Sequence, residues 1–103
     1  MKQISCKELK ALLAERSDIP LVDVREQYEH DAFNIGGILI PSSEIMQQHV
    51  VIPRNKPVIL YCRKGIRSAI AIQRLEEKFG FTNLINLAGG ISEWQEETHS
   101  KPN

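Results

Sequence analysis

One cysteine and three cations lie close together in the segment LYCRKGIRSA, just past the middle of the chain. An apolar run ends in Cys62, and the residues that follow it include Arg63, Lys64, Gly65 and Arg67. Nearby positive charge favours a thiolate over a thiol, and a thiolate is a nucleophile. The grouping therefore predicts a reactive cysteine.

Residues 62–68 join an expected strand to the start of an expected helix. The backbone N–H groups of such a loop can turn inward as a nest for an anion, and the helix dipole adds partial positive charge there. Gly65 supplies the backbone freedom that so tight a turn needs. The alternative is a small buried cysteine that only fills the core. Such a cysteine needs neither the glycine nor the cations, so we favour the reactive one.

The spacing between Cys62 and Arg67 separates two reaction classes that use a thiolate in an anion-binding loop. Cysteine phosphatases have five residues between their cysteine and arginine, whereas four lie between Cys62 and Arg67. A shorter loop encloses a smaller cavity, which suits the single outer sulfur atom of a persulfide better than a phosphoryl group. The spacing therefore favours transfer of a sulfane sulfur over hydrolysis of a phosphate ester.

Composition restricts the class of protein. The chain has 103 residues, of which 42% are apolar, and this suffices for the core of one domain over residues 1–103. Lys and Arg number 13, as do Asp and Glu, and this balance argues against a nucleic-acid partner. No apolar run reaches the roughly 20 residues of a membrane span, and the N-terminus lacks the apolar core of a signal peptide. We therefore expect a cytoplasmic protein with no membrane partner.

The two cysteines, Cys6 and Cys62, are predicted to be free thiols, because a reducing cytoplasm disfavours a disulfide. The sequence contains neither a CxxC pair nor a cluster of histidines, so it predicts no metal and no cofactor. The three histidines are scattered along the chain, and we predict solvated surface positions for His30, His49 and His99.

Strands and helices are expected to alternate. Short apolar runs indicate strands at residues 20–24, 38–40, 57–62 and 82–87. The stretches between them indicate helices at residues 4–15, 25–33, 42–50, 68–81 and 88–97, with a frayed tail over 97–103. This alternation predicts an α/β domain with a mostly parallel sheet covered on both faces. Ligands of such sheets bind at the carboxyl ends of strands, which is where Cys62 is expected.

Four separated segments resemble the signatures of the rhodanese family, the thiosulfate sulfurtransferases. They are LVDVREQYE, NIGGILIP, CRKGIRSA and LAGGISEW, and they cover nearly the whole chain in the order of the single-domain form. The resemblance implies a central, mostly parallel sheet of about five strands with helices on both faces. The second segment departs from the family pattern, because Asn34 and Gly36 replace a histidine and a proline. This departure leaves the shape of that loop open.

The resemblance also implies a sulfurtransferase whose catalytic residue is Cys62. Its thiolate would take the outer sulfur of thiosulfate or a similar donor and pass it, as a persulfide, to cyanide, a thiol or a protein acceptor. The basic residues after the cysteine resemble those of thiosulfate-using members more than those of mercaptopyruvate-using ones. The loop that binds substrate and persulfide would consist of Arg63, Lys64, Gly65, Ile66, Arg67 and Ser68.

Four further side chains allow two interpretations each. Asp23 and Arg25 would either line the site from a neighbouring strand end or form an ion pair that braces the loop, and we favour the brace. Trp94 is assigned to the core, since an aromatic residue on an amphipathic helix usually packs there. Cys6 is interpreted as incidental, because only Lys7 brings positive charge near it.

Three rival functions compete with the sulfurtransferase. A cysteine phosphatase or arsenate reductase is disfavoured by the loop length, and a binding module that has lost catalysis is disfavoured by the presence of Cys62. An intermediate case stays open, namely a sulfur carrier that serves one protein acceptor and uses thiosulfate only in the test tube. The sequence identifies neither the physiological donor and acceptor nor the oligomeric state.

Overall fold

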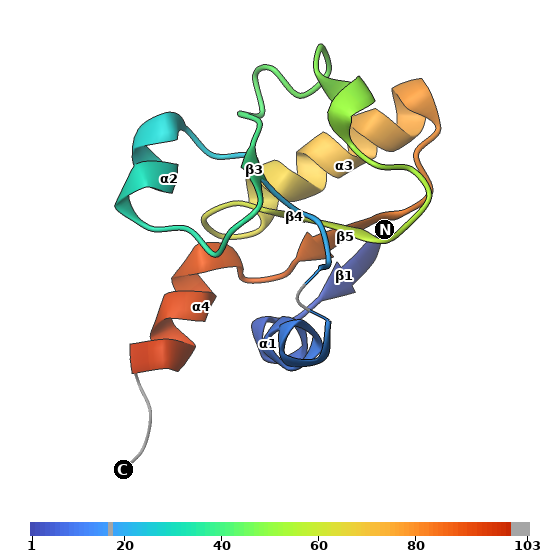
Figure 1. The fold of residues 1–103 in the computed structure, drawn as a ribbon. Helices are drawn as coiled ribbons and strands as arrows, with labels where there is room; N and C mark the ends of the chain where they lie inside the picture. The colour runs from blue at the N-terminus through green and yellow to red at the C-terminus, as the bar shows by residue number, and fades with distance from the viewer. Residues whose placement is uncertain (17, 100–103) are drawn as a thin grey trace.

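The computed structural model describes residues 1–16 and 18–99, and a parallel sheet forms their centre (Figure 1). The sheet has five strands in the order β1-β5-β4-β2-β3, and each neighbouring pair is parallel. The strands are β1 (Lys2–Ile4), β2 (Leu21–Asp23), β3 (Ile38–Leu39), β4 (Val58–Tyr61) and β5 (Leu84–Leu87). The predicted α/β fold is confirmed. Strand β1 was not predicted, because three residues at an edge carry too short a pattern.

Helices follow the strands on both sides of the sheet. They are α1 (Cys6–Glu15), α2 (Gln27–Ala32), the 3₁₀ helix η1 (His49–Val51), α3 (Ile66–Phe79) and α4 (Gly90–His99). Figure 1 shows α3 on one side of the sheet and α1 on the other. None of the helices in the described part of the chain has the length and apolar character needed to cross a membrane.

The core consists of two clusters, one on each face of the sheet. All four residues of β4 are buried, and successive residues point to opposite faces. Val58 and Leu60 pack in the cluster that contains Ile72 and Leu75 of α3. The other cluster takes in Ile59, Tyr61, Cys6, Leu9, Leu87 and Ile91, with Trp94 packed against it. Trp94 is half-buried and lies at the margin of this cluster, so its assignment to the core is only partly right.

The start of α1 agrees with the sequence pattern. The Ser5 hydroxyl accepts a hydrogen bond from the Glu8 backbone N–H at 3.0 Å, and the Glu8 carboxylate accepts one from the Ser5 N–H at 2.9 Å. This reciprocal pair satisfies two donors at the helix N-terminus and fixes where α1 begins. Leu9 is then placed to pack on the underside of the sheet.

The helix predicted for residues 42–50 is wrong. Hydrogen bonds that span three residues, such as Glu44 N–H to the Pro41 carbonyl at 2.8 Å and Gln47 N–H to the Glu44 carbonyl at 3.0 Å, form turns there instead. Such turns are tighter than an α-helix. They bring Ile45 into the cluster beneath α3, and this burial outweighs the helical pattern of the sequence.

The predicted frayed tail, residues 97–103, overlaps α4. The helix runs to His99, so the first three positions of that range are helical. The remaining positions, 100–103, lie outside the described residues.

Candidate active site

Cys62 follows directly after the carboxyl end of β4, as predicted, and its side chain is buried with 1% of its surface exposed. Helix α4 fixes its backbone from the far side of the loop. The Ile91 N–H donates to the Cys62 carbonyl at 2.9 Å, and the Ser92 N–H donates to the Arg63 carbonyl at 2.8 Å. The first-turn donors of α4, which have no acceptor within their own helix, thus hold the loop in place.

The thiol of Cys62 lies at the N-terminus of α3. Its Sγ accepts hydrogen bonds from the Gly65 N–H at 3.1 Å and the Ser68 N–H at 3.4 Å, and the Ser68 hydroxyl lies 3.3 Å away. Gly65 is the N-cap of α3 and has no side chain to accept these donors. The sulfur takes the place of a capping side chain. The N–H groups around it form the inward-facing nest that the sequence predicted.

Gly65 has the backbone conformation that the tight turn was expected to need. Its φ of 86° lies in the left-handed region, which residues other than glycine adopt only at an energetic cost. A Cβ atom at this position would also lie 3.1 Å from the Leu87 carbonyl oxygen and 3.2 Å from the Gly89 nitrogen. The loop can therefore close over Cys62 only because residue 65 has no side chain.

The three cations of the loop do not act alike. Arg63 and Lys64 are exposed, whereas Arg67 donates to both carboxylate oxygens of Glu29 in α2, each at 3.0 Å. These hydrogen bonds lower the pKa of Glu29 to about 2. The sequence patterns did not connect Glu29 with the loop, because the two residues of the pair are far apart in the chain. Ile66, the remaining loop residue, is 64% exposed.

Asn86 is a buried polar residue near Cys62 that the sequence patterns did not single out. It lies in β5 with 2% of its surface exposed. Its Oδ1 accepts a hydrogen bond of 2.5 Å from the Ser68 hydroxyl, and its Nδ2 donates to the Gly65 carbonyl at 3.0 Å. The one signal in the sequence is a polar residue inside the apolar run LINL.

Asp23 and Arg25 form an ion pair, as in the interpretation that we favoured, and Arg25 also lines a pocket beside the loop. Arg25 donates to Asp23 from Nε at 2.9 Å and from Nη2 at 2.8 Å, and both residues are buried. Arg25 Nη2 also donates to the Phe33 carbonyl at 2.6 Å, so the pair ties β2 to the end of α2. Burial opposes the ionisation of Asp23, but the hydrogen bonds from Arg25 and His30 outweigh it and hold the pKa of Asp23 below its ordinary value.

The predicted surface positions of the histidines are only partly right. His30 Nδ1 lies 2.9 Å from a carboxylate oxygen of Asp23, and the ring of His49 stacks on Phe79 with 3.7 Å between centroids. Both rings are thus held by specific partners. The side chain of His99 lies outside the described part of the structure.

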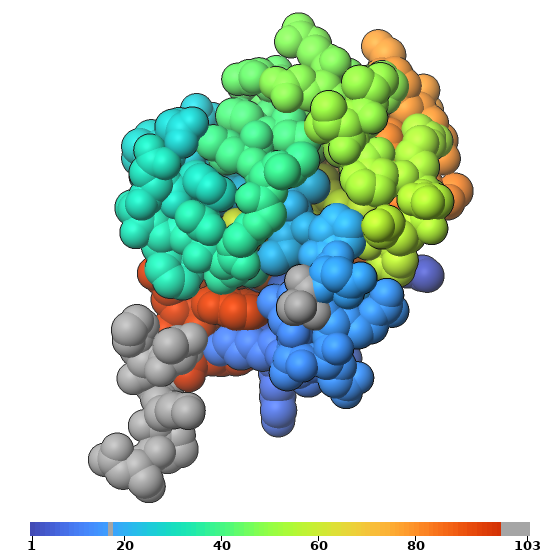
Figure 2. All heavy atoms as spheres, in the orientation of Figure 1, coloured from blue at the N-terminus to red at the C-terminus, as the bar shows by residue number. Residues whose placement is uncertain are grey.

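Two adjoining pockets open beside the loop. One is lined by Cys62, Arg63, Lys64, Ile66 and Arg67. The other shares Arg63 with it and lies between α2 and α4, where Tyr28, Phe33 and Gln95 line it. Figure 2 shows the cyan α2 segment beside the red-orange start of α4. The thiol is therefore approached across a surface that α2, α4 and the loop share.

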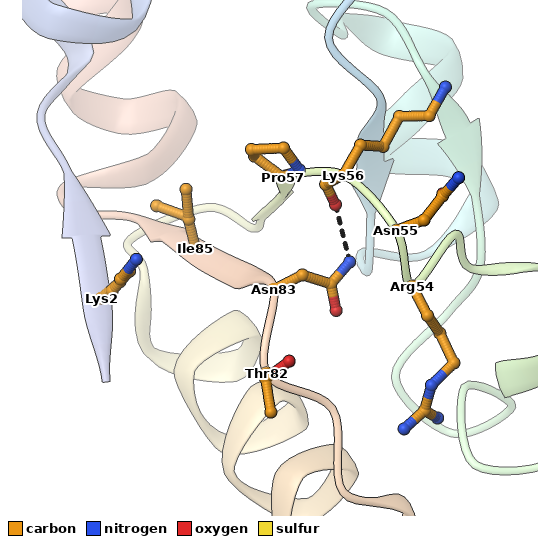
Figure 3. A pocket seen from close by; sticks show the side chains of 8 residues that line it. All are labelled: Lys2, Arg54, Asn55, Lys56, Pro57, Thr82, Asn83 and Ile85. Carbon is orange, nitrogen blue, oxygen red and sulfur yellow. Dashed lines mark hydrogen bonds between the residues drawn. The ribbon is translucent and has the colours of Figure 1, made fainter.

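A further pocket lies at the opposite end of the sheet (Figure 3). Residues at the amino ends of strands line it, among them Lys2, Pro57 and Asn83. The Lys56 and Arg54 side chains point away from each other in Figure 3, so their charges do not converge on one ligand. The Nδ2 group of Asn83 donates to the Lys56 carbonyl at 2.7 Å. This pocket is not part of the Cys62 site.

Comparison with known proteins agrees with this geometry. The family model of the rhodanese-like domain matches residues 5–97. The chain belongs to the rhodanese-like domain family. Two relatives that this rhodanese-like domain matches over most of their length are named a sulfurtransferase and a thiosulfate sulfurtransferase.

Three similar proteins illustrate the relationship. Thiosulfate sulfurtransferase GlpE of Coxiella burnetii is 36% identical over 95 residues, which cover 91% of this chain and 87% of that protein. The probable adenylyltransferase/sulfurtransferase MoeZ of Mycobacterium tuberculosis is 35% identical over 97 residues, but the chain spans only 24% of its length. The crystal structure of a rhodanese-like domain protein from Staphylococcus aureus has a TM-score of 0.82 and 32% identity, covering 91% of each chain.

The structure of this rhodanese-like domain shows what Asn34 and Gly36 do in the second signature, where they replace a histidine and a proline. The Asn34 Oδ1 accepts from the Gly36 N–H at 2.9 Å, and the Asn34 Nδ2 donates to the His30 carbonyl at 2.9 Å. Gly36 has a φ of 103°, which proline cannot adopt, and its N–H is used as a donor. Asn34 and Gly36 therefore build this loop together, and the Tyr61 hydroxyl donates to the Gly36 carbonyl at 2.9 Å from beneath.

Cys6 is structural rather than reactive. Both cysteines are free, as predicted, and Cys6 is fully buried. Its Sγ donates to the Gly90 carbonyl at 3.4 Å. Burial, followed by the negative charge of Glu93, raises the pKa of the Cys6 thiol to about 12, so it stays protonated at neutral pH. This agrees with the interpretation of Cys6 as incidental to the chemistry.

Proposed function

We propose that this rhodanese-like domain is a thiosulfate sulfurtransferase that carries a sulfane sulfur as a persulfide on Cys62. The observation that carries the proposal is the convergence of the Gly65 and Ser68 N–H groups on one sulfur atom, at 3.1 and 3.4 Å. Fixed donors around a single position stabilise negative charge there without reorganisation. They are suited to an anionic sulfur that is held between two steps.

The first step loads the cysteine. The Cys62 thiolate forms a bond to the outer sulfur of thiosulfate while the bond between the two sulfur atoms of thiosulfate breaks, and the electron pair leaves with sulfite. Arg63 and Lys64 are exposed beside the pocket that contains Cys62, where their charges attract the sulfonate end of the donor. Arg67, oriented by Glu29, completes the positive surroundings.

The second step transfers the sulfur from the Cys62 persulfide to an acceptor. A nucleophile, which is cyanide, a thiol or a cysteine of a protein acceptor, attacks the outer sulfur of the persulfide and the Cys62 thiolate leaves. The exposed Tyr28 and Ile66, 73% and 64% accessible, give the surface around the pockets an apolar character that suits a protein acceptor. Two free thiols fit a reducing compartment such as the cytoplasm.

Transfer of sulfur from thiosulfate to cyanide tests the proposal. The unaltered protein should form thiocyanate, and Cys62→Ser should abolish this, because a serine hydroxyl is not ionised at neutral pH and cannot hold the sulfur. Circular dichroism should show the same fold for both proteins. Thiocyanate formation by folded Cys62→Ser at the parent rate would overturn the proposal. Replacing thiosulfate by mercaptopyruvate as donor tests the choice of donor separately, and faster turnover of mercaptopyruvate would contradict it.

A further inference from the structure

The side chain of Asn86 bonds to both residues that donate to Cys62 Sγ. Its Nδ2 donates to the Gly65 carbonyl at 3.0 Å, and its Oδ1 accepts from the Ser68 hydroxyl at 2.5 Å. The backbone N–H groups of the same two residues donate to Sγ at 3.1 and 3.4 Å. One side-chain amide thus connects the two residues whose backbone donors converge on the sulfur.

Asn86 itself is held within the sheet. It lies in β5, where its partners in register are Gln3 of β1 on one side and Leu60 of β4 on the other. Its Nδ2 also donates to the Gln3 Oε1 at 3.2 Å. Asn86 and Ser68 have 2% and 0% of their surfaces exposed, so water has little access to replace these partners. The amide therefore ties the loop to the interior of the sheet.

The two backbone donors need a support from outside the helix. N–H groups in the first turn of an α-helix have no acceptor within that helix, so intrahelical hydrogen bonds do not fix their direction. Gly65 is the N-cap of α3, and a glycine has more backbone freedom than any other residue. The hydrogen bond from Asn86 to the Gly65 carbonyl restricts this freedom, and the bond from the Ser68 hydroxyl holds the first turn of α3 at the same time.

We propose that Asn86 is a positioning residue for sulfur transfer, which holds Gly65 and Ser68 in the arrangement that directs their N–H groups at one sulfur atom. The proposal rests on the proposed function, in which these donors stabilise an anionic sulfur. Such donors are effective because they are in place before the charge develops, and a displacement far smaller than a bond length of the loop weakens them. Asn86 acts through Gly65 and Ser68 rather than on the reacting sulfur.

Asn83 offers a matched control for substitutions of Asn86. It directly precedes β5, and its Nδ2 donates to the Pro53 and Lys56 carbonyls, each at 2.7 Å, at the opposite end of the sheet (Figure 3). Asn83→Ala and Asn86→Ala each remove an asparagine amide that donates to a backbone carbonyl, so both should lower the free energy of unfolding in urea. Only Asn86→Ala should disturb the donors around Cys62.

Loading of Cys62 by thiosulfate in a single turnover, followed by mass spectrometry of quenched samples, distinguishes the two variants. With Asn86→Ala the rate at saturating thiosulfate should fall about tenfold, which is less than the 100-fold or more that follows loss of a preorganised donor itself. The thiosulfate concentration that gives half of this rate should match the parent, because Arg63 and Lys64 are unchanged. Asn83→Ala should load at the parent rate. Equal rates for the two variants, or a change confined to the half-saturating concentration, would overturn the proposal.

Hydrogen exchange of the Gly65 and Ser68 N–H groups, measured by NMR, gives a second readout that needs no sulfur donor. Exchange at both amides should be about tenfold faster in Asn86→Ala than in Asn83→Ala, because only the first variant loses the support of the loop. Equal exchange in the two variants would show that Asn86 does not hold these donors. If the parent protein took no sulfur from thiosulfate, the proposed function would fail, and this comparison would still decide the role of Asn86.

Ser68→Ala provides the test if Asn86→Ala does not fold. It removes the hydroxyl that donates to Asn86 Oδ1 but leaves the bond between Nδ2 and the Gly65 carbonyl. Corrected for the intrinsic rate of each residue type, exchange at position 68 should be faster than in the parent, and the Gly65 N–H should keep the parent rate. Exchange at position 68 that equals that of the parent would contradict the proposal.

Discussion

Arg67 and Glu29 form a bidentate ion pair, in which Nη1 and Nη2 of the arginine each donate to one carboxylate oxygen at 3.0 Å. The pair joins the first turn of α3 to α2. Paired charges in this planar arrangement have a defined geometry as well as a favourable energy. The positive charge of Arg67 is therefore held in a fixed position beside Cys62 rather than on a mobile side chain.

Glu29→Gln is expected to weaken sulfur transfer. The amide cannot accept from both guanidinium nitrogens, so Arg67 loses its orientation, and a charge-assisted hydrogen bond of about 1 kcal/mol corresponds to roughly fivefold in kcat/KM. Steady-state rates of transfer from thiosulfate to cyanide measure this. Asp31→Asn is the matched control, because Asp31 lies on the same helix and bonds to Gln27 instead. Equal rates for the two variants would show that the pair does not support the chemistry.

The same pair should make stability depend on pH in a defined window. The pKa of Glu29 is lowered from 4.5 to about 2, chiefly by its hydrogen bonds with Arg67. A carboxylate whose pKa is depressed on folding contributes stability above its unfolded pKa, and this contribution is lost as the pH falls through the folded value. Urea unfolding should show the parent more stable than Glu29→Gln at neutral pH, with the difference shrinking between about pH 4.5 and 2. A difference that stays constant over this range contradicts the assignment.

Local patterns predicted the features that depend on residues close together in sequence. The capping box of Ser5 and Glu8, the strand before Cys62 and the left-handed Gly65 each follow from a few neighbouring residues. The order of strands and helices likewise indicated a parallel sheet. A parallel sheet in turn predicts a site at the carboxyl end of a strand, here β4.

Contacts between distant parts of the chain were not predicted. Glu29 lies 38 residues from Arg67, and Asn86 lies 18 residues from Ser68, so no periodicity connects either pair. The turns at residues 42–47 were missed for a related reason, since the burial of Ile45 beneath α3 is a tertiary effect. In each case tertiary packing determines which residues come into contact, and the spacing of residues along the sequence does not reveal these contacts.

Cys6→Ser is expected to leave sulfur transfer close to the parent rate. Cys6 is buried, its thiol donates to the Gly90 carbonyl, and its pKa is raised to about 12, so it supplies no thiolate at neutral pH. The smaller, more polar serine should lower the free energy of unfolding by about 1 kcal/mol. Assays of activity and urea unfolding on the same preparation separate the two effects. A large loss of activity in a folded variant would mean that a second thiol takes part.

Inserting one glycine between Gly65 and Ile66 tests whether loop length sets the chemistry. The insertion moves the Ser68 N–H away from the Gly65 N–H, so the two donors no longer converge on Sγ. Sulfur transfer should fall on the order of 100-fold, as when a preorganised donor is displaced. Hydrolysis of an aryl phosphate should be undetectable in the parent. A folded insertion variant with the parent rate of transfer would remove the argument from loop length.

Mass spectrometry of the intact protein after exposure to thiosulfate tests the persulfide on Cys62 most directly. The unaltered protein and Cys6→Ser should each gain the mass of one sulfur atom, and peptide mapping should place it on Cys62. Cys62→Ser should gain nothing, although both cysteine variants keep the fold. No gain in the unaltered protein, or a sulfur that persists in Cys62→Ser, would contradict the proposal that this loop holds a persulfide.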